Sequence, residues 1–91
     1  MDIKYSKQAY KYLKKLHKPK AKQIINAINK LPNGEGNIVK IRGIENLYRL
    51  RVDDYRVLFT PEHEVIMIEK IGSRGDIYNG IKWRSSTQTF Q

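Results

Sequence analysis

The chain has 91 residues, which is the size of one domain with a single core and no second module. Its 18 lysine and arginine residues against 9 acidic ones give a formal net charge of +9. This imbalance favours a polyanionic partner such as nucleic acid, or an acidic protein, over a basic surface that is merely solvated. The absence of cysteine excludes disulfides and thiolate metal sites.

The positive charge is unevenly placed along the chain. The first thirty residues hold nine lysines and one acidic residue, whereas arginine predominates among the basic residues after Gly43. Lysine suits diffuse attraction to phosphates and arginine suits forked, directed contacts. We therefore expect docking through the N-terminal third and a specific site further along. No stretch is apolar enough for a signal peptide or a bilayer span, so we expect a cytoplasmic protein without a membrane partner.

The first third of the chain predicts a short strand followed by a pair of helices. Ile3 and Tyr5 alternate with polar residues, which is typical of a strand. Ser6 is suited to cap a helix over residues 7–17, and Pro19 is suited to the first turn of a second helix that ends at Pro32. The positions expected to face the core are Ala9, Leu13 and Leu16 in the first helix and Ala21, Ile24, Ile25, Ile28 and Leu31 in the second.

The stretch from Leu47 to Thr60 predicts a β-hairpin, because two alternating runs flank the turn-forming pair Asp53-Asp54. With these two residues as the loop, Arg51 lies directly opposite Arg56 on one side, and Arg49 lies further along the same side. Like charges directly opposite each other destabilise a sheet. We therefore expect this cluster to bind an anion. The other side is apolar, through the pairs Val52–Tyr55, Leu50–Val57 and Tyr48–Phe59.

The remaining segments complete the prediction of the fold. A short strand at residues 38–42 precedes the hairpin, and a turn at residues 61–63 leads to a buried central strand at residues 64–71. Asp76 is suited to cap a short final helix that contains Ile77 and Tyr78. We expect an α+β domain in the order β-α-α-β-β-β-α, with a mostly antiparallel sheet of about four strands and the helical pair on one face. The arginine side of the hairpin is then expected on the opposite face, which is concave or open.

Several kinds of chemistry find no support in the sequence. His17 and His63 lie far apart in this interpretation, and the acidic residues form no cluster with ligand spacing, so we expect neither a metal nor a cofactor. No Ser/His/Asp arrangement is evident. The Gly72-Ser-Arg-Gly75 segment matches no phosphate-binding loop.

Arginine and tyrosine remain as candidate site residues, namely Arg49, Arg51, Arg56, Arg74 and Tyr78. Arginines bind phosphate through forked contacts, and a tyrosine ring stacks on a base. The two regions come together if strands 55–60 and 64–71 are neighbours. The same set could also cleave RNA, because attack by a 2′-hydroxyl needs charge stabilisation on the phosphorane. A solvated arginine face with Tyr78 in the core is the alternative interpretation.

The segments Tyr48–Phe59 and Ile71–Tyr78 together resemble the signature of the RelE family of toxins, within the RelE/ParE superfamily. The helical pair and the final helix fit the same family. The resemblance implies a single toxin domain over residues 1–84, and we expect residues 85–91 to form a flexible C-terminal tail. It further implies a metal-independent endoribonuclease (an mRNA interferase) that cleaves messenger RNA in the ribosomal A site by 2′-hydroxyl attack.

The resemblance also implies roles for the candidate residues. Arg56 matches the arginine that stabilises transition-state charge, and Arg51 matches a second hairpin arginine. Arg74 resembles the arginine proposed as general acid, and Tyr78 resembles the base-stacking tyrosine.

The sequence departs from the family at the two positions that hold lysines in a well-known relative. These positions are Arg49 and Leu47 here. Leucine cannot move a proton and arginine is a poor general base. We therefore expect Arg49 to stabilise the phosphate, and the resemblance assigns no general base.

The partners implied by the resemblance are a cognate antitoxin, the ribosome and mRNA. The lysines expected to contact ribosomal RNA are Lys11, Lys14, Lys15, Lys18 and Lys22, and a solvated outer helix face explains them equally well. Two other functions stay open. One is a ParE-like gyrase inhibitor on the same fold, and the other is a non-catalytic RNA-binding module.

Overall fold

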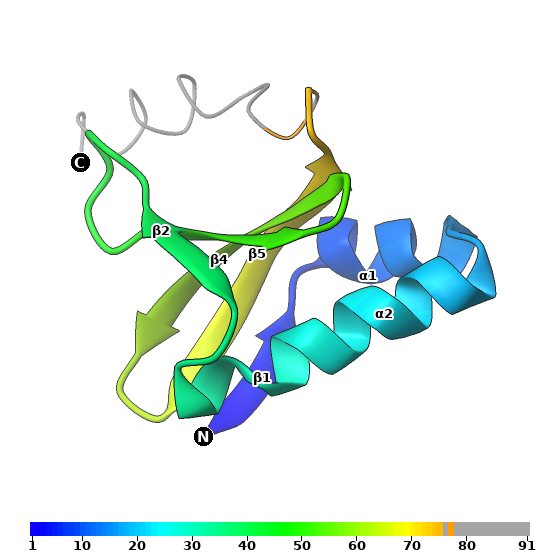
Figure 1. Ribbon diagram of the computed structural model, residues 1–91. Coiled ribbons are helices and arrows are strands. Elements are labelled where there is room, and N and C mark those ends of the chain that lie inside the picture. The colour runs from blue at the N-terminus through cyan, green and yellow to red at the C-terminus, as the bar shows by residue number, and fades with distance from the viewer. Residues whose placement is uncertain (76, 78–91) are drawn as a thin grey trace.

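The computed structural model describes residues 1–75 and 77 (Figure 1). The elements follow one another as β1 (Asp2–Tyr5), α1 (Lys7–Lys15), α2 (Lys18–Asn29), a short 3₁₀ helix η1 (Leu31–Asn33), β2 (Asn37–Lys40), β3 (Tyr48–Val52), β4 (Tyr55–Glu62) and β5 (Val65–Ser73). Neither α-helix of this described part is long and apolar enough to cross a membrane. The predicted final helix after residue 75, apart from Ile77, and the predicted tail at residues 85–91 lie outside the described residues.

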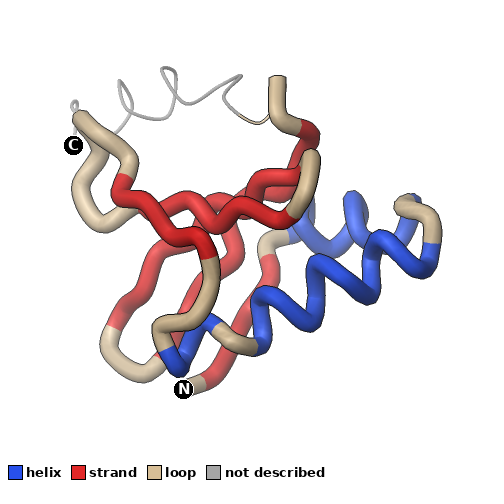
Figure 2. Tube along the Cα trace, viewed as in Figure 1, coloured by secondary structure: helices blue, strands red, loops and turns tan. Residues whose placement is uncertain are grey.

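The sheet has five strands in the order β1-β5-β4-β3-β2, and both helices lie on one side of it (Figure 2). The predicted α+β class is therefore confirmed, whereas the prediction of about four strands was one short. Neighbouring strands are antiparallel except β1 and β5, which pair in parallel. After β1 the chain passes through the helical pair to the opposite edge of the sheet at β2. Strands β3, β4 and β5 then follow, each antiparallel to the one before, until β5 lies beside β1 and parallel to it.

The two helices begin largely as predicted, but the first ends earlier. Ser6 caps α1, since its Oγ accepts a hydrogen bond from Ala9 N at 3.1 Å. Leu16 is extended (ψ 150°), so the helix ends at Lys15, and Lys18 opens α2 with Pro19 in its first turn. The chain reverses between the helices through Leu16 and His17, which both have non-helical ψ values.

The main core lies between the helices and the apolar side of the sheet. Its buried members include Ala9, Ile24, Ile28 and Leu31 from the helical half and Leu50, Val52, Val57, Phe59, Ile66, Ile68 and Ile71 from the strands. Ile25 was expected in this stripe but is 36% exposed, because it lies one position to the side of the Ile24–Ile28 row. Tyr48 is half-buried and stacks on Phe59.

The strand predicted as central is β5, which lies between β1 and β4, while β4 occupies the centre of the sheet. The burial of β5 alternates from Val65 to Ile68, because the helices cover only one face of this strand. Leu58 pairs with Lys70 and Phe59 with Ile68, so Glu69 is the extra residue of a β-bulge. The turn before β5 is His63-Glu64 rather than residues 61–63, since β4 continues through Pro61.

Beyond the end of β1, Ser6 and the first turn of α1 form hydrogen bonds with the backbone of β5. Gln8 Nε2 donates to Ile71 O at 3.0 Å, and Ile71 N donates to Gln8 Oε1 at 3.0 Å. The Ser6 hydroxyl donates to Glu69 O at 2.7 Å. These bonds fix the end of β5, which leads directly to Arg74.

Candidate nucleic-acid site

The hairpin formed by β3 and β4 has the predicted register. Val52 pairs with Tyr55 across a two-residue turn, and Arg51 pairs with Arg56. Asp53 has a left-handed backbone (φ 57°), a conformation that aspartate tolerates better than most residues. The loop length and the alternation of the two strands together set this register.

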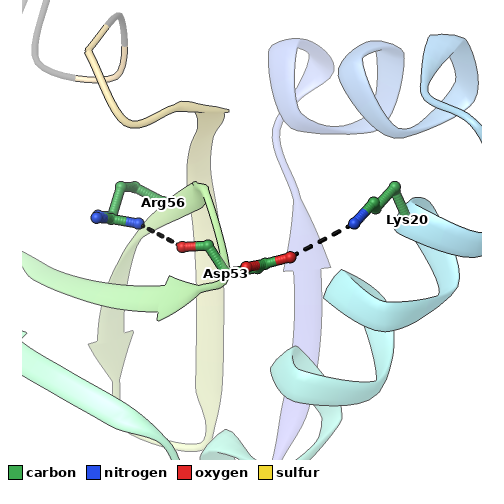
Figure 3. Close-up of polar contacts among 3 residues, drawn as sticks. All are labelled: Lys20, Asp53 and Arg56. Carbon is green, nitrogen blue, oxygen red and sulfur yellow. Dashed lines mark hydrogen bonds and ion pairs between the residues drawn. The ribbon is translucent and has the colours of Figure 1, made fainter.

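The like-charged pair is accommodated by turning Arg56 toward the backbone of the turn. Its Nη1 donates to Asp53 O at 2.9 Å (Figure 3). The same nitrogen donates to Tyr55 O at 3.0 Å. Arg56 is 7% exposed, whereas Arg51 is an exposed residue. A guanidinium has five N–H donors, so three of them are not used by these two bonds. The acceptors are neutral carbonyls, and the positive charge of Arg56 therefore remains uncancelled by them.

Arg74 lies at the same end of the sheet as this pair. Strands β4 and β5 are neighbours, and Tyr55 pairs with Ser73 at the end of β5. Arg74 N donates to Asp54 O of the hairpin turn at 2.9 Å, and its side chain is exposed. Strands β4 and β5 are neighbours, which was the condition for the hairpin arginines and Arg74 to come together. Tyr78 lies outside the described residues.

The arginine face lies opposite the helices as expected, but a second, small apolar cluster covers part of it. Its buried members are Ile44, Leu47, Leu58 and Ile77. Leu58 is the cross-strand partner of Arg49, which is half-buried beside it. Sequence reasoning missed this cluster, although the alternation of β4 does place Leu58 on the arginine side.

Arg51 also belongs to a groove on the edge of the site. It lines this groove, between α2 and β3, together with polar and charged residues (Gln23, Asn26, Lys30 and Glu35) and apolar residues (Ala27, Leu50 and Val52). Cationic and amide side chains can contact the phosphates and base edges of a nucleic acid, whereas the Glu35 carboxylate would repel a phosphate. Arg51 therefore borders a groove of mixed polarity beside α2.

The lysines of the helices form a separate basic surface. Lys11, Lys14, Lys15, Lys18 and Lys22 are all exposed. They belong to the helices that cover one face of the sheet, whereas Arg51 and Arg56 lie on the other face. The two layers are joined at the site by an edge-on contact of the Tyr12 and Tyr55 rings and by an ion pair, in which Lys20 Nζ lies 3.4 Å from the Asp53 carboxylate (Figure 3). Both side chains are about half exposed, so this ion pair contributes little to stability.

Within the described residues, no three His, Cys, Asp or Glu side chains are placed to hold a metal ion. His17 precedes α2 and His63 lies in the turn between β4 and β5.

Solved structures of toxins share this fold. RelE of Pyrococcus horikoshii OT3, in its complex with RelB, is 30% identical, with a TM-score of 0.68 over 81% of this chain and 94% of that one. RelE of Methanococcus jannaschii, in its complex with RelB, is 27% identical, with a TM-score of 0.69 over 84% and 95%. A mutant of the E. coli toxin RelE in the free state is 17% identical, with a TM-score of 0.67 over 99% and 97%, and this likeness concerns the fold alone.

The class of protein defined by the fold and the comparisons is a small toxin domain of the RelE/ParE superfamily. The model of the family described as ParE toxin of type II toxin–antitoxin system, parDE, matches residues 3–78. The chain belongs to this family. No curated protein sequence matched the chain.

Proposed function

We propose that this toxin is a metal-independent endoribonuclease that cleaves mRNA in the ribosomal A site. The observation that carries the proposal is the gathering of Arg51, Arg56 and Arg74 at the turn end of β3, β4 and β5. Three arginines from separate positions in the chain converge there, and arginine recognises phosphate by forked hydrogen bonds. The 30% identity to an archaeal RelE over most of both chains adds support.

The reaction requires the site to stabilise charge more than to move protons. The 2′-oxygen forms a bond to phosphorus while the bond from phosphorus to the 5′-oxygen breaks, leaving a 2′,3′-cyclic phosphate and a 5′-hydroxyl. Negative charge grows on the phosphorane oxygens during this step. Arg56 is suited to stabilise it because two backbone carbonyls hold its guanidinium before RNA arrives. Arg51 is exposed and suited to bind the phosphate or its neighbour.

The family resemblance assigns a proton donor for the departing 5′-oxygen and no acceptor for the proton of the 2′-hydroxyl. Arg74 is the proposed general acid, although the high pKa of a guanidinium suits it better to stabilise charge on the departing 5′-oxygen. Leu47 is 1% exposed within the apolar cluster and takes no part. Arg49 is proposed to stabilise the phosphate, and Tyr78 is proposed to stack on a base.

The partners follow from the same proposal. Two of the similar toxins are seen in complexes with RelB, which supports an antitoxin partner for this chain. The lysines of α1 and α2 are proposed to contact ribosomal RNA. Because they lie on the opposite face from the arginines, both surfaces can contact nucleic acid at once.

The test is cleavage of ribosome-bound mRNA followed by mapping of the new ends relative to the reading frame. Frame-locked ends are expected for the wild type, and Arg56→Ala and Arg74→Ala should lower the rate by about 100-fold or more each, as for loss of a transition-state contact. Arg42→Ala, which removes an exposed arginine in the loop after β2, is the matched control and should cut at the wild-type rate. Wild-type rates in both site variants would refute the proposal.

Inhibition of gyrase is the second candidate, and the match to the ParE family favours it. This function requires protein binding and no chemistry from the arginines. Inhibition of supercoiling with purified gyrase, by a protein that leaves ribosome-bound mRNA intact, would establish it in place of cleavage. A protein whose affinity for RNA falls steeply with salt concentration, but which neither cleaves mRNA nor inhibits gyrase, would be the non-catalytic RNA-binding module.

A further inference from the structure

Ile77 is completely buried even though it follows an exposed turn. Its side chain packs in the small cluster with Ile44, Leu47 and Leu58 on the arginine face. It also lies directly over Gly72 in β5. A Cβ built on Gly72 would lie 3.3 Å from Ile77 Cδ1, 3.5 Å from its Cα and 3.7 Å from its Cβ.

The close approach explains the glycine at this position. Gly72 is not among the residues with a positive φ, so its backbone does not require glycine. Glycine is suited to this position because it has no side chain, which leaves room for Ile77 to lie against the strand. Gly72 is also the cross-strand partner of Arg56. Ile77 is therefore packed on the residue of β5 that pairs with Arg56 of β4.

The turn between β5 and Ile77 is held at both ends. At its start, Arg74 N donates to Asp54 O of the hairpin turn at 2.9 Å. At its end, Ile77 N donates to Ser73 O at 3.0 Å, and the Ile77 side chain is buried on Gly72. Arg74 makes the first of these attachments through its backbone, while its side chain is exposed.

We infer that Ile77 is a positioning residue for the site: its packing on Gly72 holds the turn that carries Arg74 beside the Arg51–Arg56 pair. The inference rests on the proposed function in so far as Arg74 acts on RNA. The physical reason is that backbone hydrogen bonds at an exposed turn resist fraying poorly. Loss of the apolar anchor leaves the turn with two such bonds, from Arg74 N to Asp54 O and from Ile77 N to Ser73 O. Reaction rates fall steeply when a catalytic group shifts by about 1 Å.

The first experiment compares Ile77→Ala with Ile44→Ala. Both residues are isoleucines of the same cluster, exposed by 0% and 5%, so the two variants should lose similar stability. Only Ile77 is attached to the turn of Arg74. For Ile77→Ala we expect the single-turnover rate at saturating ribosomes to fall about 10- to 100-fold, with the half-saturating ribosome concentration unchanged. Ile44→Ala should keep a rate close to that of the wild type.

Hydrogen exchange gives a second measurement that does not depend on activity. The amide of Arg74 should exchange faster in Ile77→Ala than in Ile44→Ala, because its bond to Asp54 O opens more often. A milder pair of variants guards against loss of folding. Gly72→Ala should displace Ile77 and slow cleavage, and adding Ile77→Val, which removes the Cδ1 atom nearest the new Cβ, should restore part of the rate.

The outcomes separate the inference from the proposed function. If the wild type cleaves and Ile77→Ala matches Ile44→Ala in rate and in Arg74 exchange, the positioning role is refuted. If the wild type does not cleave ribosome-bound mRNA, the proposed function fails. The exchange rate of the Arg74 amide then still tests whether Ile77 anchors the turn. Equal rates in Ile77→Ala and Ile44→Ala would overturn the anchoring role.

Discussion

Replacement of Gln8 by alanine tests how strongly the end of β5 depends on α1. The Gln8 amide makes two hydrogen bonds with the backbone of Ile71, one as donor and one as acceptor, both 3.0 Å long. Ile71 itself is completely buried. Two lost bonds at about 1 kcal/mol each, with some further cost for backbone groups left unsatisfied, give a loss of about 2–4 kcal/mol. For a domain of this size that corresponds to a fall in Tm of roughly 10–25 °C.

The assay is urea unfolding followed by circular dichroism, with thermal unfolding as a check. Lys11→Ala is the matched control, because Lys11 is an exposed residue of the same helix and alanine is an equally good helix former. It should change the free energy of unfolding by less than about 0.5 kcal/mol. An equally small change for Gln8→Ala would refute the reasoning.

Gln8→Glu adds a signature that packing alone does not predict. A protonated carboxyl group can donate to Ile71 O and accept from Ile71 N, as the amide does, whereas a carboxylate has no proton to donate. The pKa of the new side chain should therefore be raised in the folded state. Its stabilising contribution is present at low pH and lost as pH rises through that folded pKa. Gln8→Glu should thus exceed Gln8→Ala in stability by more at acidic than at neutral pH.

Three further predictions concern other positions. Ser6→Ala should cost about 1–2 kcal/mol in urea unfolding, because the hydroxyl both caps α1 and donates to Glu69 O, and a loss within error would contradict it. Gly36→Ala should destabilise more than Gly34→Ala by about 1–3 kcal/mol in the same assay; both glycines have positive φ, but only at Gly36 would a Cβ clash, at 2.8 Å from Leu50 Cδ1, so equal losses would rule out the clash. Burial raises the pKa of Tyr5, so stability should fall as pH rises through about 10, the ordinary value, toward the folded pKa. The urea midpoint of Tyr5→Phe should fall less over this range, and parallel curves would count against this cause.

Local patterns in the sequence predicted the elements that local physics controls. The hairpin register follows from a two-residue loop and from the alternation of Leu50 and Val52, since a slip of one residue would turn both out of the core. The Ser6 cap follows in the same way from the side chain and the apolar positions after it. The end of α1 at Lys15 did not follow, because the reversal toward α2 sets it and the periodicity continues through Leu16.

Features formed between distant segments were beyond these patterns. The parallel pairing of β1 with β5 joins residues more than sixty positions apart, and no local preference selects it. The bulge at Glu69 depends on how β5 meets both β4 and α1. The apolar cluster on the arginine face includes Ile44 and Leu47 from a loop without periodicity, so no local pattern indicated that this face was partly covered. Arg74 could be placed near the hairpin only once β4 and β5 were known to be neighbours.

The sheet accommodates the repulsion between Arg51 and Arg56, which are directly opposite each other in the hairpin. A carboxylate beside Arg56 would relieve the repulsion, but it would also cancel the charge that a phosphate needs. Two backbone carbonyls orient the guanidinium and leave its charge intact. The left-handed conformation of Asp53 contributes, because the same residue that turns the chain offers its carbonyl to Arg56 and its carboxylate to Lys20, on the side of the helices (Figure 3). Sites that break a local rule in this way are where function is expected, and here the rule is broken by the residue pair that faces Gly72 and, through it, Ile77.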